Sequence, residues 1–501
     1  MNYKDFTLIT ADSRKVIPGA LFVAVKGYSS DGHDYIQSAI DKGATGIICE
    51  RIPEGTDVPE SSLRDPSHPA DGPLPLTWPR VATDSGTSVP SGVQFEVVEN
   101  SRKALALAAD EFYGHPSRKL TLVGITGTNG KTTTVTLLYN LFRALGYQCG
   151  LLSTIANYVG DERYETENTT VDPVTLNELM ARMVEKGCEY CFMEVSSIGV
   201  EQDRVTGLHF KLGIFSNLTH DHLDYHKTFA EYLRCKKLFF DNLSKDAIAL
   251  INTDDSHGQV MVQNTPARVV TYSVKGLADH TARVQEQSFE GMLLKIDGKE
   301  VWTRLIGAHN AYNLLAIYSA AVCLGANPTE TLVALSSLES APGRLENLRG
   351  PRDLAVVIDY AHTPDALQNV LETLRAIARE RQLICLFGCG GDRDRSKRPE
   401  MAQIAQRLAD RLVITSDNPR TEDPDAIIED IKAGLTPEGM AKSLVIANRR
   451  EAIRTAILTA PEGATILLAG KGHETYQIIG REKTHFDEKE IVEETFKLIL
   501  K

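Results

Sequence analysis

The sequence predicts an α/β protein with three domains. Its 501 residues exceed what one hydrophobic core holds, and domains of about 150 residues would divide the chain into three. Short apolar runs alternate with helix-like segments from residue 120 to about 335, and the alternation restarts after a Pro-Gly-Arg segment at 341–344. Such alternation is typical of a largely parallel sheet covered by helices. We therefore expect domains at 1–116, 117–340 and 341–501, with 341–344 as a hinge.

Bulk composition excludes several classes of protein. The net charge of −13 argues against broad binding to nucleic acid, which needs a basic face. No apolar run approaches the ~20 residues of a membrane helix, so we expect no membrane insertion. The first residues lack a basic-then-apolar signal segment, and the eight cysteines are scattered rather than spaced like a disulfide framework. We expect a cytoplasmic protein.

The first domain begins with apolar segments at 20–26 and 46–49, which predict buried strands, and a helix-like segment at 36–42 separates them. A loop rich in Gly, Ser and Asp follows the first strand at 27–34. Residues from about 53 to 92 change character, because Pro, Ser, Asp and Gly dominate there without periodicity. We interpret this stretch as a surface insertion or flexible loop without a catalytic role.

The second domain contains a phosphate-binding loop. An apolar strand at 120–126 runs into Gly127-Thr128-Asn129-Gly130-Lys131-Thr132-Thr133, and a helix at 131–145 ends before Gly146. The loop has the short Gly-x-x-Gly-Lys-Thr form, because Ile125 stands where the full motif has glycine. Its glycines let backbone N–H groups point at phosphate, Lys131 adds positive charge, and Thr132 can bind Mg²⁺. The loop predicts an ATP site.

Polar residues near the ends of the next strands suggest a metal site. Strands are expected at 190–195, 212–215 and 247–251. Glu194 ends the first, and His222 lies in a His- and Asp-rich segment after the second. Oxygen and imidazole ligands beside a phosphate loop suit Mg²⁺ or Mn²⁺. Zinc is the alternative for clustered histidines, and a lone histidine often only caps a helix; the phosphate loop favours the metal site.

Two basic residues allow more than one interpretation. Lys236 lies on an expected helix, where a solvated surface lysine is the default. Arg344 follows the expected hinge, and it could stabilise a phosphoryl group in transfer. An ordinary salt bridge between domains is an equally good interpretation of Arg344.

The third domain places four polar loops at strand ends. Strands at 354–359, 383–387, 411–415 and 465–469 alternate with helical segments such as 365–379 and 450–459. Ligands bind outside the carboxyl ends of strands in such sheets, so the four loops predict one site. Arg393 and Arg420 could bind a carboxylate through their guanidinium groups, and Glu474 could pair with an amine. A substrate with both groups is an amino acid.

Taken together, these motifs resemble those of the Mur ligases of peptidoglycan synthesis, over nearly the whole chain. The matching segments are Asp12-Ser13-Arg14, 127–133, 167–170, 194–197, 221–226, 307–310 with Asn313, 342–344, 359–364, 388–393, 417–420 and 470–474. The resemblance implies an N-terminal UDP-binding α/β domain, a central P-loop ATPase-like α/β domain and a C-terminal Rossmann-like α/β domain. It also implies Mg²⁺ as cofactor, ATP as co-substrate and a monomeric enzyme.

The resemblance further assigns site residues by match of motif. Lys236 matches a carbamylated lysine whose carbamate bridges Mg²⁺, and Glu194 and His222 match metal ligands. Carbamylation needs a neutral amine. Asn313 and Asp359 match adenine- and ribose-binding positions. The UDP moiety would meet Ser13, Tyr28, Ser29 and Ser30. The muramoyl-dipeptide would meet Asn168, Thr169, Thr170, Ser196, Gln202 and Arg204.

The amino acid implied by the resemblance is meso-diaminopimelate. In this family Asp-Asn-Pro-Arg marks the enzymes that add it, whereas lysine-adding members depart at the arginine. The pocket would consist of Arg393, Asp417, Asn418, Pro419, Arg420, Gly470 and Glu474. ATP would phosphorylate the γ-carboxylate of D-glutamate in UDP-N-acetylmuramoyl-L-alanyl-D-glutamate, and the amine would then attack the acyl phosphate. Catalysis would depend on Lys131, Arg344 and the metal.

Three alternatives remain at this stage. A lysine-adding Mur ligase would share the reaction but not the second carboxylate of the substrate. A folylpolyglutamate synthetase-like ligase would share the phosphate loop but should lack Asp-Asn-Pro-Arg and the UDP-type domain. A nucleotide-binding regulator would bind ATP without turnover, and the presence of Lys131, Glu194, His222 and Lys236 argues against it.

Overall fold

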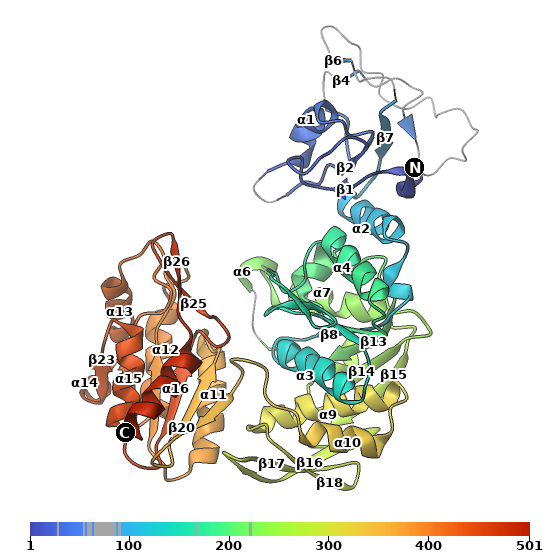
Figure 1. The fold of residues 1–501 in the computed structure, drawn as a ribbon. Helices are drawn as coiled ribbons and strands as arrows, with labels where there is room; N and C mark the ends of the chain where they lie inside the picture. Colours follow the sequence, from blue (N-terminus) through green and yellow to red (C-terminus); the bar gives the residue numbers. More distant parts are fainter. Residues whose placement is uncertain are drawn as a thin grey trace. The chain divides into compact units, whose positions relative to one another are not determined.

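The computed structural model (Figure 1) describes residues 1–27, 30–53, 56–57, 63–64, 87–88, 92–166, 168–219 and 223–500. The chain divides into two compact units. Unit 1 holds Met1–Val135 and Phe142–Val270, and unit 2 holds Thr136–Leu141 and Thr271–Lys501. Within the described residues, no helix has both the length and the apolar character needed to cross a membrane. The expected boundaries at 116 and 340 stay predictions.

A five-stranded parallel sheet forms the N-terminal part of unit 1, in the order β1-β2-β3-β7-β5. The strands are β1 (Ile9–Thr10), β2 (Leu21–Val23), β3 (Gly46–Cys49), β7 (Gln94–Val97) and β5 (Leu63–Arg64). Alternate residues face opposite sides: Phe22 and Ile47 pack with α1 (Ile36–Asp41), whereas Leu21 and Ile48 pack with α2 (Ser101–Phe112). Short 3-10 helices occur at η1 (Tyr3–Asp5), η2 (Gly32–Tyr35) and η4 (Pro116–Arg118).

The expected insertion at 53–92 lies largely outside the described residues. Its described parts are the strands β4 (Thr56–Asp57), β5 and β6 (Thr87–Ser88). β4 pairs with β6, and β5 pairs with β7 through Leu63 and Phe95. The stretch therefore supplies an edge strand to the sheet. The expectation of a surface insertion without a catalytic role stays a prediction.

The second sheet of unit 1 carries the phosphate loop on its central strand, β8 (Thr121–Thr126). In the order β11-β10-β9-β12-β8-β13-β14-β15, the strands from β9 to β14 run parallel and β10 and β11 form an antiparallel edge. The other strands are β9 (Cys149–Leu152), β10 (Asn157–Val159), β11 (Glu162–Tyr164), β12 (Tyr190–Glu194), β13 (Phe210–Phe215), β14 (Ile248–Asn252) and β15 (Arg268–Ser273), which spans the boundary of the units. The helices are α3 (Lys131–Ala144), α4 (Pro173–Glu185), α5 (Ser197–Glu201), α6 (Leu223–His226), α7 (Phe229–Asp241) and α8 (Gly258–Met261).

Unit 2 begins with an antiparallel meander. It consists of β16 (His280–Ser288), β17 (Gly291–Ile296) and β18 (Lys299–Thr303), packed beside α9 (Ala308–Cys323) and α10 (Pro328–Ser336). The expected hinge at 341–344 lies between α10 and the next strand, β19 (Glu346–Arg349).

The C-terminal sheet has six strands in the order β19-β20-β24-β21-β22-β23, and all pairs except β19–β20 are parallel. The strands are β20 (Ala355–Asp359), β21 (Leu383–Phe387), β22 (Arg411–Ile414), β23 (Ser443–Val445) and β24 (Thr465–Ala469), and the hairpin β25 (Tyr476–Ile479) and β26 (Glu482–His485) follows. The helices are α11 (Pro364–Ala378), α12 (Lys397–Leu408), α13 (Pro424–Lys432), α14 (Pro437–Ala441), α15 (Arg449–Thr459) and α16 (Glu488–Ile499).

Both faces of this sheet are buried, which explains the near-continuous apolar strands. Val357 and Leu467 pack against α11, whereas Val356 and Leu468 pack against α15 and α16 on the opposite face. The strands predicted at 354–359, 383–387, 411–415 and 465–469 each agree with the structure to within one residue. The Rossmann-like expectation for this domain is confirmed.

Candidate active site

The phosphate loop joins β8 to α3 in a backbone conformation that requires glycine. Gly127 has a φ of +153°, and a Cβ there would lie 2.0 Å from Ser216 Oγ. Gly130 has a φ of +88°. Asn217 supports the loop from the end of β13, because its Oδ1 accepts the Asn129 N–H at 2.9 Å. The loop is therefore pre-formed at the N-terminus of a helix, where anions bind.

Lys131 and Thr132, the predicted phosphate and metal ligands, are the first two residues of α3. The Lys131 ammonium donates to the carbonyl oxygens of Gly127 and Thr128 at 2.9 and 2.8 Å. Thr132 Oγ1 donates to Glu194 Oε2 at 3.0 Å, and the Thr154 N–H donates to Glu194 Oε1 at 2.8 Å. Glu194 is buried at the carboxyl end of β12, next to β8. A hydroxyl and a carboxylate thus converge beside the loop.

Lys236 is buried, so the default expectation of a solvated side chain is wrong. Its relative exposure is 1%, and its ammonium donates to the Gly127 carbonyl at 2.8 Å and lies 4.5 Å from the centre of the Tyr232 ring. Residue 236 lies on α7 with Tyr232 and Phe240, whose buried side chains turn this face of the helix toward the sheet. The third predicted metal ligand, His222, lies outside the described residues.

The residues expected to hold the muramoyl-dipeptide cluster around the end of β12. Thr170 Oγ1 donates to the Glu194 carbonyl and accepts the Ser196 N–H, and Thr169 Oγ1 accepts from Thr154 Oγ1 at 3.1 Å. The guanidinium of Arg204 donates to Gln202 Oε1 at 2.7 Å and to the Thr170 carbonyl. Asn168 is exposed on the same segment. The structure therefore brings this predicted set together.

A cleft of about 710 Å³ lies beside the first sheet. It is lined by two of the predicted UDP residues, Ser13 and Ser30, whereas Tyr28 and Ser29 lie outside the described residues. Leu8, Ile9 and Leu105 give it apolar walls, and polar groups come from several elements: Asp12, Arg14, Tyr35, Tyr113, Thr175 and Glu178. Such a mixture suits a nucleotide.

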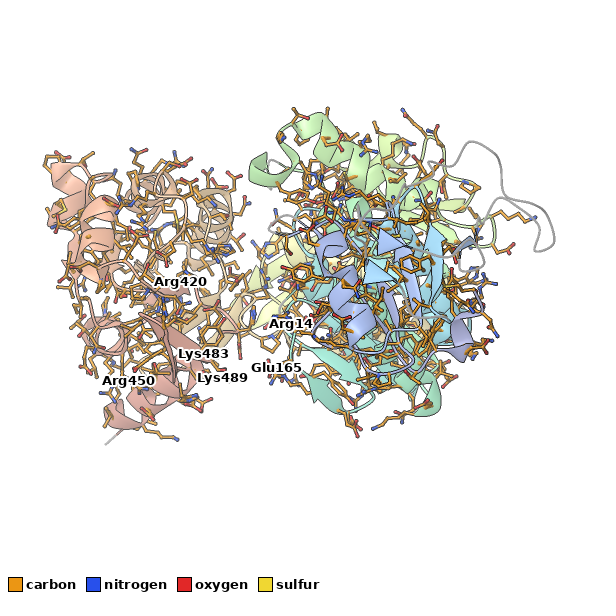
Figure 2. The ribbon with its side chains drawn as sticks, turned by 90° about the horizontal axis from the view of Figure 1, so that it is seen from above. Arg14, Glu165, Arg420, Arg450, Lys483 and Lys489 are labelled. Carbon is orange, nitrogen blue, oxygen red and sulfur yellow. The ribbon has the colours of Figure 1, made fainter. Side chains whose placement is uncertain are left out.

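Arg14 lies on the rim of this cleft with its side chain 86% exposed (Figure 2). Its guanidinium donates to Asp12, and this hydrogen bond holds the pKa of the Asp12 carboxyl at about 2. Sequence reasoning missed Tyr35, Tyr113 and Thr175, because no local pattern marks a residue that reaches a cleft from another element.

The residues expected around adenine and ribose lie in unit 2. Asn313 is buried on α9 and donates to Asn310 Oδ1 at 2.8 Å. Asp359 ends β20, where its two oxygens accept the N–H groups of Leu345 and Ala361 at 2.8 and 2.9 Å. Burial raises the pKa of Asp359. Its carboxylate thus holds the segment after the hinge against the strand end.

Arg344 lies on this held segment. Its guanidinium carbon lies 5.0 Å from the centre of the Tyr360 ring, and within the described residues its buried Nε has no hydrogen-bond partner. Gly343 has a φ of +64°, and a Cβ there would lie 2.1 Å from the His473 nitrogen. The hinge loop and the loop after β24 therefore approach so closely that only glycine fits at position 343.

The four polar loops of the C-terminal sheet meet at the carboxyl ends of its strands, as predicted. Arg420 Nη1 donates to the Gly391 carbonyl at 2.9 Å, and a Cβ at Gly390 would lie 3.0 Å from that nitrogen and 3.7 Å from Arg393 Cγ. The two predicted arginines therefore lie near each other, with Arg393 exposed and Arg420 half-buried. The backbone of Arg420 is held by β25, because its N–H donates to the Ile478 carbonyl.

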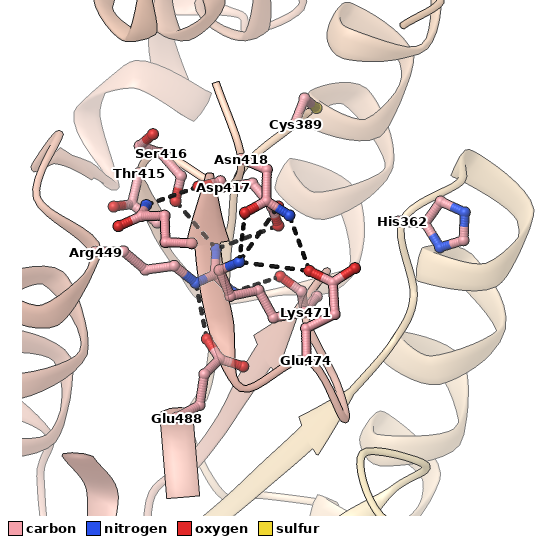
Figure 3. A network of polar contacts seen from close by, with 12 residues as sticks. His362, Cys389, Thr415, Ser416, Asp417, Asn418, Arg449, Lys471, Glu474 and Glu488 are labelled. Atoms are coloured by element: carbon pink, nitrogen blue, oxygen red, sulfur yellow. Dashed lines mark hydrogen bonds and ion pairs between the residues drawn. The ribbon is translucent and has the colours of Figure 1, made fainter. Parts of the chain in front are cut away.

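Asp417 and Asn418 lie on the same loop as Arg420, and Glu474 lies on the loop after β24 (Figure 3). Asn418 Nδ2 donates to Glu474 Oε2 at 2.8 Å. A Cβ at Gly470 would lie 2.6 Å from Asp417 Oδ2, so glycine there makes room for the carboxylate. Pro419 continues the loop, with its carbonyl against Gly391. Lys471, which sequence reasoning did not select from its own motif, lies at the centre of this network.

Three family models match the chain in succession. They are the Mur ligase family catalytic domain at residues 5–70, the Mur ligase middle domain at 125–321 and the Mur ligase glutamate ligase domain at 343–472. The chain belongs to the Mur ligase family. The three-domain α/β fold expected from the sequence is thereby confirmed.

This Mur ligase has close relatives along its whole length. It is 49% identical to a Parabacteroides distasonis protein named UDP-N-acetylmuramoyl-L-alanyl-D-glutamate–2,6-diaminopimelate ligase, over 98% of this chain and 95% of the relative. It is 48% identical to the Bacteroides fragilis protein of the same name, over 99% and 95%. A solved structure of a ligase with that name is 30% identical, with a TM-score of 0.68 and coverage of 99% and 96%.

Proposed function

We propose that this chain is the ATP-dependent ligase that adds meso-diaminopimelate to the γ-carboxylate of D-glutamate in UDP-N-acetylmuramoyl-L-alanyl-D-glutamate. The observation that carries the proposal is the end-to-end identity of 48–49% with relatives that bear this name. The Asp-Asn-Pro-Arg loop at 417–420 agrees with it, because a guanidinium suits the second carboxylate that diaminopimelate has and lysine lacks.

The phosphoryl donor would bind at 127–133. Its phosphates would bind the Lys131 ammonium, which in this structure donates to the Gly127 and Thr128 carbonyl oxygens. Asn313 and Asp359 would meet the nucleoside, and Arg344 would stabilise charge on the transferring phosphoryl group.

Thr132, Glu194, His222 and a carbamate on Lys236 would hold Mg²⁺. The donor set fits, because the Thr132 hydroxyl and the Glu194 carboxylate already converge within 3.0 Å, and hard oxygen ligands suit this ion. Bound Mg²⁺ would neutralise charge on the phosphates. Lys236 is buried beside the phosphate loop, and carbamylation would require its amine in the neutral form.

The acceptor substrate would bind from the cleft to the end of β12. UDP would occupy the cleft beside Ser13 and Ser30, and the dipeptide would meet Thr169, Thr170 and Arg204. The glutamyl γ-carboxylate would attack the γ-phosphorus of ATP and release ADP. The diaminopimelate amine would then attack the acyl carbon, lose a proton and expel phosphate, leaving the amide.

Cellular location and assembly are part of the proposal. We place the enzyme in the cytoplasm, where ATP and UDP-linked precursors are available. We also propose that it acts as a monomer.

The test measures phosphate release by purified protein with ATP, Mg²⁺ and UDP-N-acetylmuramoyl-L-alanyl-D-glutamate. With meso-diaminopimelate we expect turnover, and with L-lysine a kcat/KM at least about a hundredfold lower, because lysine leaves a guanidinium unpaired. Equal rates with both amino acids would support the lysine-adding alternative. No release with either would support the regulator.

Arg420→Ala tests the carboxylate-binding role directly. We expect its KM for diaminopimelate to rise by at least about tenfold while its KM for ATP stays unchanged, because Arg420 lies on the loop proposed to bind diaminopimelate. Arg450→Ala is the matched control, since Arg450 pairs with Glu494 away from the loops. An equal rise of the KM for diaminopimelate and the KM for ATP in Arg420→Ala would refute the assignment.

A further inference from the structure

Lys471 is a buried cation in the middle of the C-terminal strand-end loops. It follows β24, and its side chain has a relative exposure of 0%. Burial lowers the pKa of Lys471, while the neighbouring Asp417 opposes this change. An ammonium in such a place destabilises a protein unless it is paired and hydrogen-bonded. Its contacts therefore indicate what it does.

Lys471 makes its shortest contacts to one side chain and one carbonyl. Its Nζ donates to Asn418 Oδ1 at 2.9 Å and to the Tyr476 carbonyl at 2.8 Å (Figure 3). The same nitrogen lies 3.5 Å from Glu474 Oε2 and 3.9 Å from Asp417 Oδ1. Lys471 thus joins the loop after β22 to the loop after β24.

These contacts determine which way the Asn418 amide faces. Asn418 Oδ1 accepts two hydrogen bonds, from Lys471 and from the Ile478 N–H at 3.0 Å. Because both donors need an oxygen, the amide nitrogen must occupy the other side, where it donates to Glu474 Oε2 at 2.8 Å. The orientation of the Glu474 carboxylate therefore depends on Lys471, both directly and through Asn418.

A second buried cation supports the network from beneath. Arg449 on α15 donates to Glu488 at 2.7 Å and to the Ala469 carbonyl at 2.8 Å, and it lies 3.9 Å from Asp417. Arg449 and Lys471 thus face three carboxylates, those of Asp417, Glu474 and Glu488. By formal charge, two cations and three carboxylates leave one negative charge. Glu474 has the most exposed carboxylate of the three, at 14%. The network is therefore suited to receive one more cation at Glu474.

We propose that Lys471 is the positioning residue for the amino-acid substrate: it fixes the Asn418 amide so that Glu474 presents its carboxylate to the substrate ammonium in a single orientation. The proposal rests on the proposed function, and it adds a residue that touches no substrate. Lys471 acts through Asn418 and Glu474. Its removal should weaken amino-acid binding and leave ATP binding unchanged, since the polar side-chain contacts of Lys471 in the described part of the chain are to Asn418, Glu474 and Asp417 and not to Asn313 or Asp359.

The experiment measures steady-state kinetics of Lys471→Met, Asn418→Ala and the double variant in the full-length enzyme. We expect each single substitution to raise the KM for diaminopimelate on the order of tenfold, with the KM for ATP within about twofold of wild type. The double variant should lose little more than Lys471→Met, because Lys471→Met already removes both the direct contact to Glu474 and the support of Asn418. Multiplied effects in the double variant, or equal changes of both KM values, would overturn the proposal.

Arg375→Met is the matched control for loss of a cation that binds carbonyl oxygens. Arg375 donates to the Leu408 carbonyl and to Asp410 near the opposite ends of the strands, so we expect an unchanged KM for diaminopimelate. If Lys471→Met does not fold, Lys471→Ala with added n-propylamine replaces it. Recovery of the diaminopimelate KM by propylamine, but not by n-butanol, would support positioning by a cation, and recovery by neither would contradict it.

Wild-type activity distinguishes a failure of the proposed function from a failure of the role assigned to Lys471. If wild type releases no phosphate with diaminopimelate, the proposed function fails and this inference fails with it. If wild type is active and Lys471→Met keeps its diaminopimelate KM within about twofold of wild type, only the inference fails.

Discussion

At the scale of single residues, glycines decide how closely the loops of the site can pack. Gly127 lets the phosphate loop pass Ser216, and Gly343 lets the hinge loop touch the loop after β24. Both have positive φ values, which side chains adopt only with strain. A methyl group at either position would therefore both strain the backbone and collide with a neighbour.

Gly127→Ala should lower both stability and nucleotide affinity. Its Cβ would lie 2.0 Å from Ser216 Oγ, and backbone strain alone costs about 1–3 kcal/mol. Gly146→Ala is the matched control, because Gly146 has a φ of +95° with open space around its Cβ position. We expect urea denaturation to show the larger loss for Gly127→Ala, and titration with ADP to show weakened binding only there. Equal losses in both variants would mean that strain, not the collision, dominates.

At the scale of elements, one buried arginine connects the loops after β21 and β22 to two helices. Arg398 on α12 has a relative exposure of 1%, and it forms ion pairs with Glu422 and Asp430 at 2.8 Å each. Asp430 lies on α13, and Glu422 also accepts the Asp392 N–H at 2.6 Å. Because Asp392 belongs to the loop after β21, this cluster holds the loop that carries Arg393 next to the loop that carries Arg420.

Glu422→Gln should change how stability depends on pH. The hydrogen bond from Arg398, together with the Asp392 N–H, lowers the pKa of Glu422 from 4.5 to about 2. A lowered carboxyl pKa contributes stability above the unfolded pKa of 4.5, and this contribution is lost as pH falls toward 2. In Glu422→Gln we expect a lower urea midpoint at pH 7 and a flatter decline between pH 4.5 and 2 than in wild type. Parallel curves for the two proteins would contradict the assignment.

At the scale of the whole molecule, the predicted site residues fall in both compact units. Unit 1 contains the phosphate loop, Glu194, Lys236 and the cleft. Unit 2 contains Arg344, Asp359 and the loops after β21, β22 and β24. The sequence identified these loops because glycine loops and strand-end polar residues are local signals, whereas the domain boundaries expected at 116 and 340 stay predictions. The positions of the C-terminal strands followed from apolar runs alone, since a sheet buried on both faces leaves no polar residues inside its strands.

What the sequence could not predict depends on contacts between distant segments. From the sequence alone, Lys236 is predicted to be a surface lysine. It is buried because the face of α7 that carries it packs against the sheet. Lys471 stands between two glycines in a recognised motif, yet its partners Asn418 and Tyr476 lie on other elements. Tyr113 reaches the cleft from beyond the end of α2. Burial and pairing of this kind are properties of the fold, and periodicity in one segment does not contain them.

The division into two units predicts that unfolding is not a single cooperative step. Each unit has buried clusters of its own, so we expect each to unfold as a cooperative body. Differential scanning calorimetry at pH 7 should resolve at least two transitions. Because Gly127 belongs to unit 1 and Glu422 to unit 2, Gly127→Ala should lower the midpoint of one transition and Glu422→Gln that of the other. A single transition whose calorimetric and van't Hoff enthalpies agree, shifted by both variants, would show that the two units unfold together.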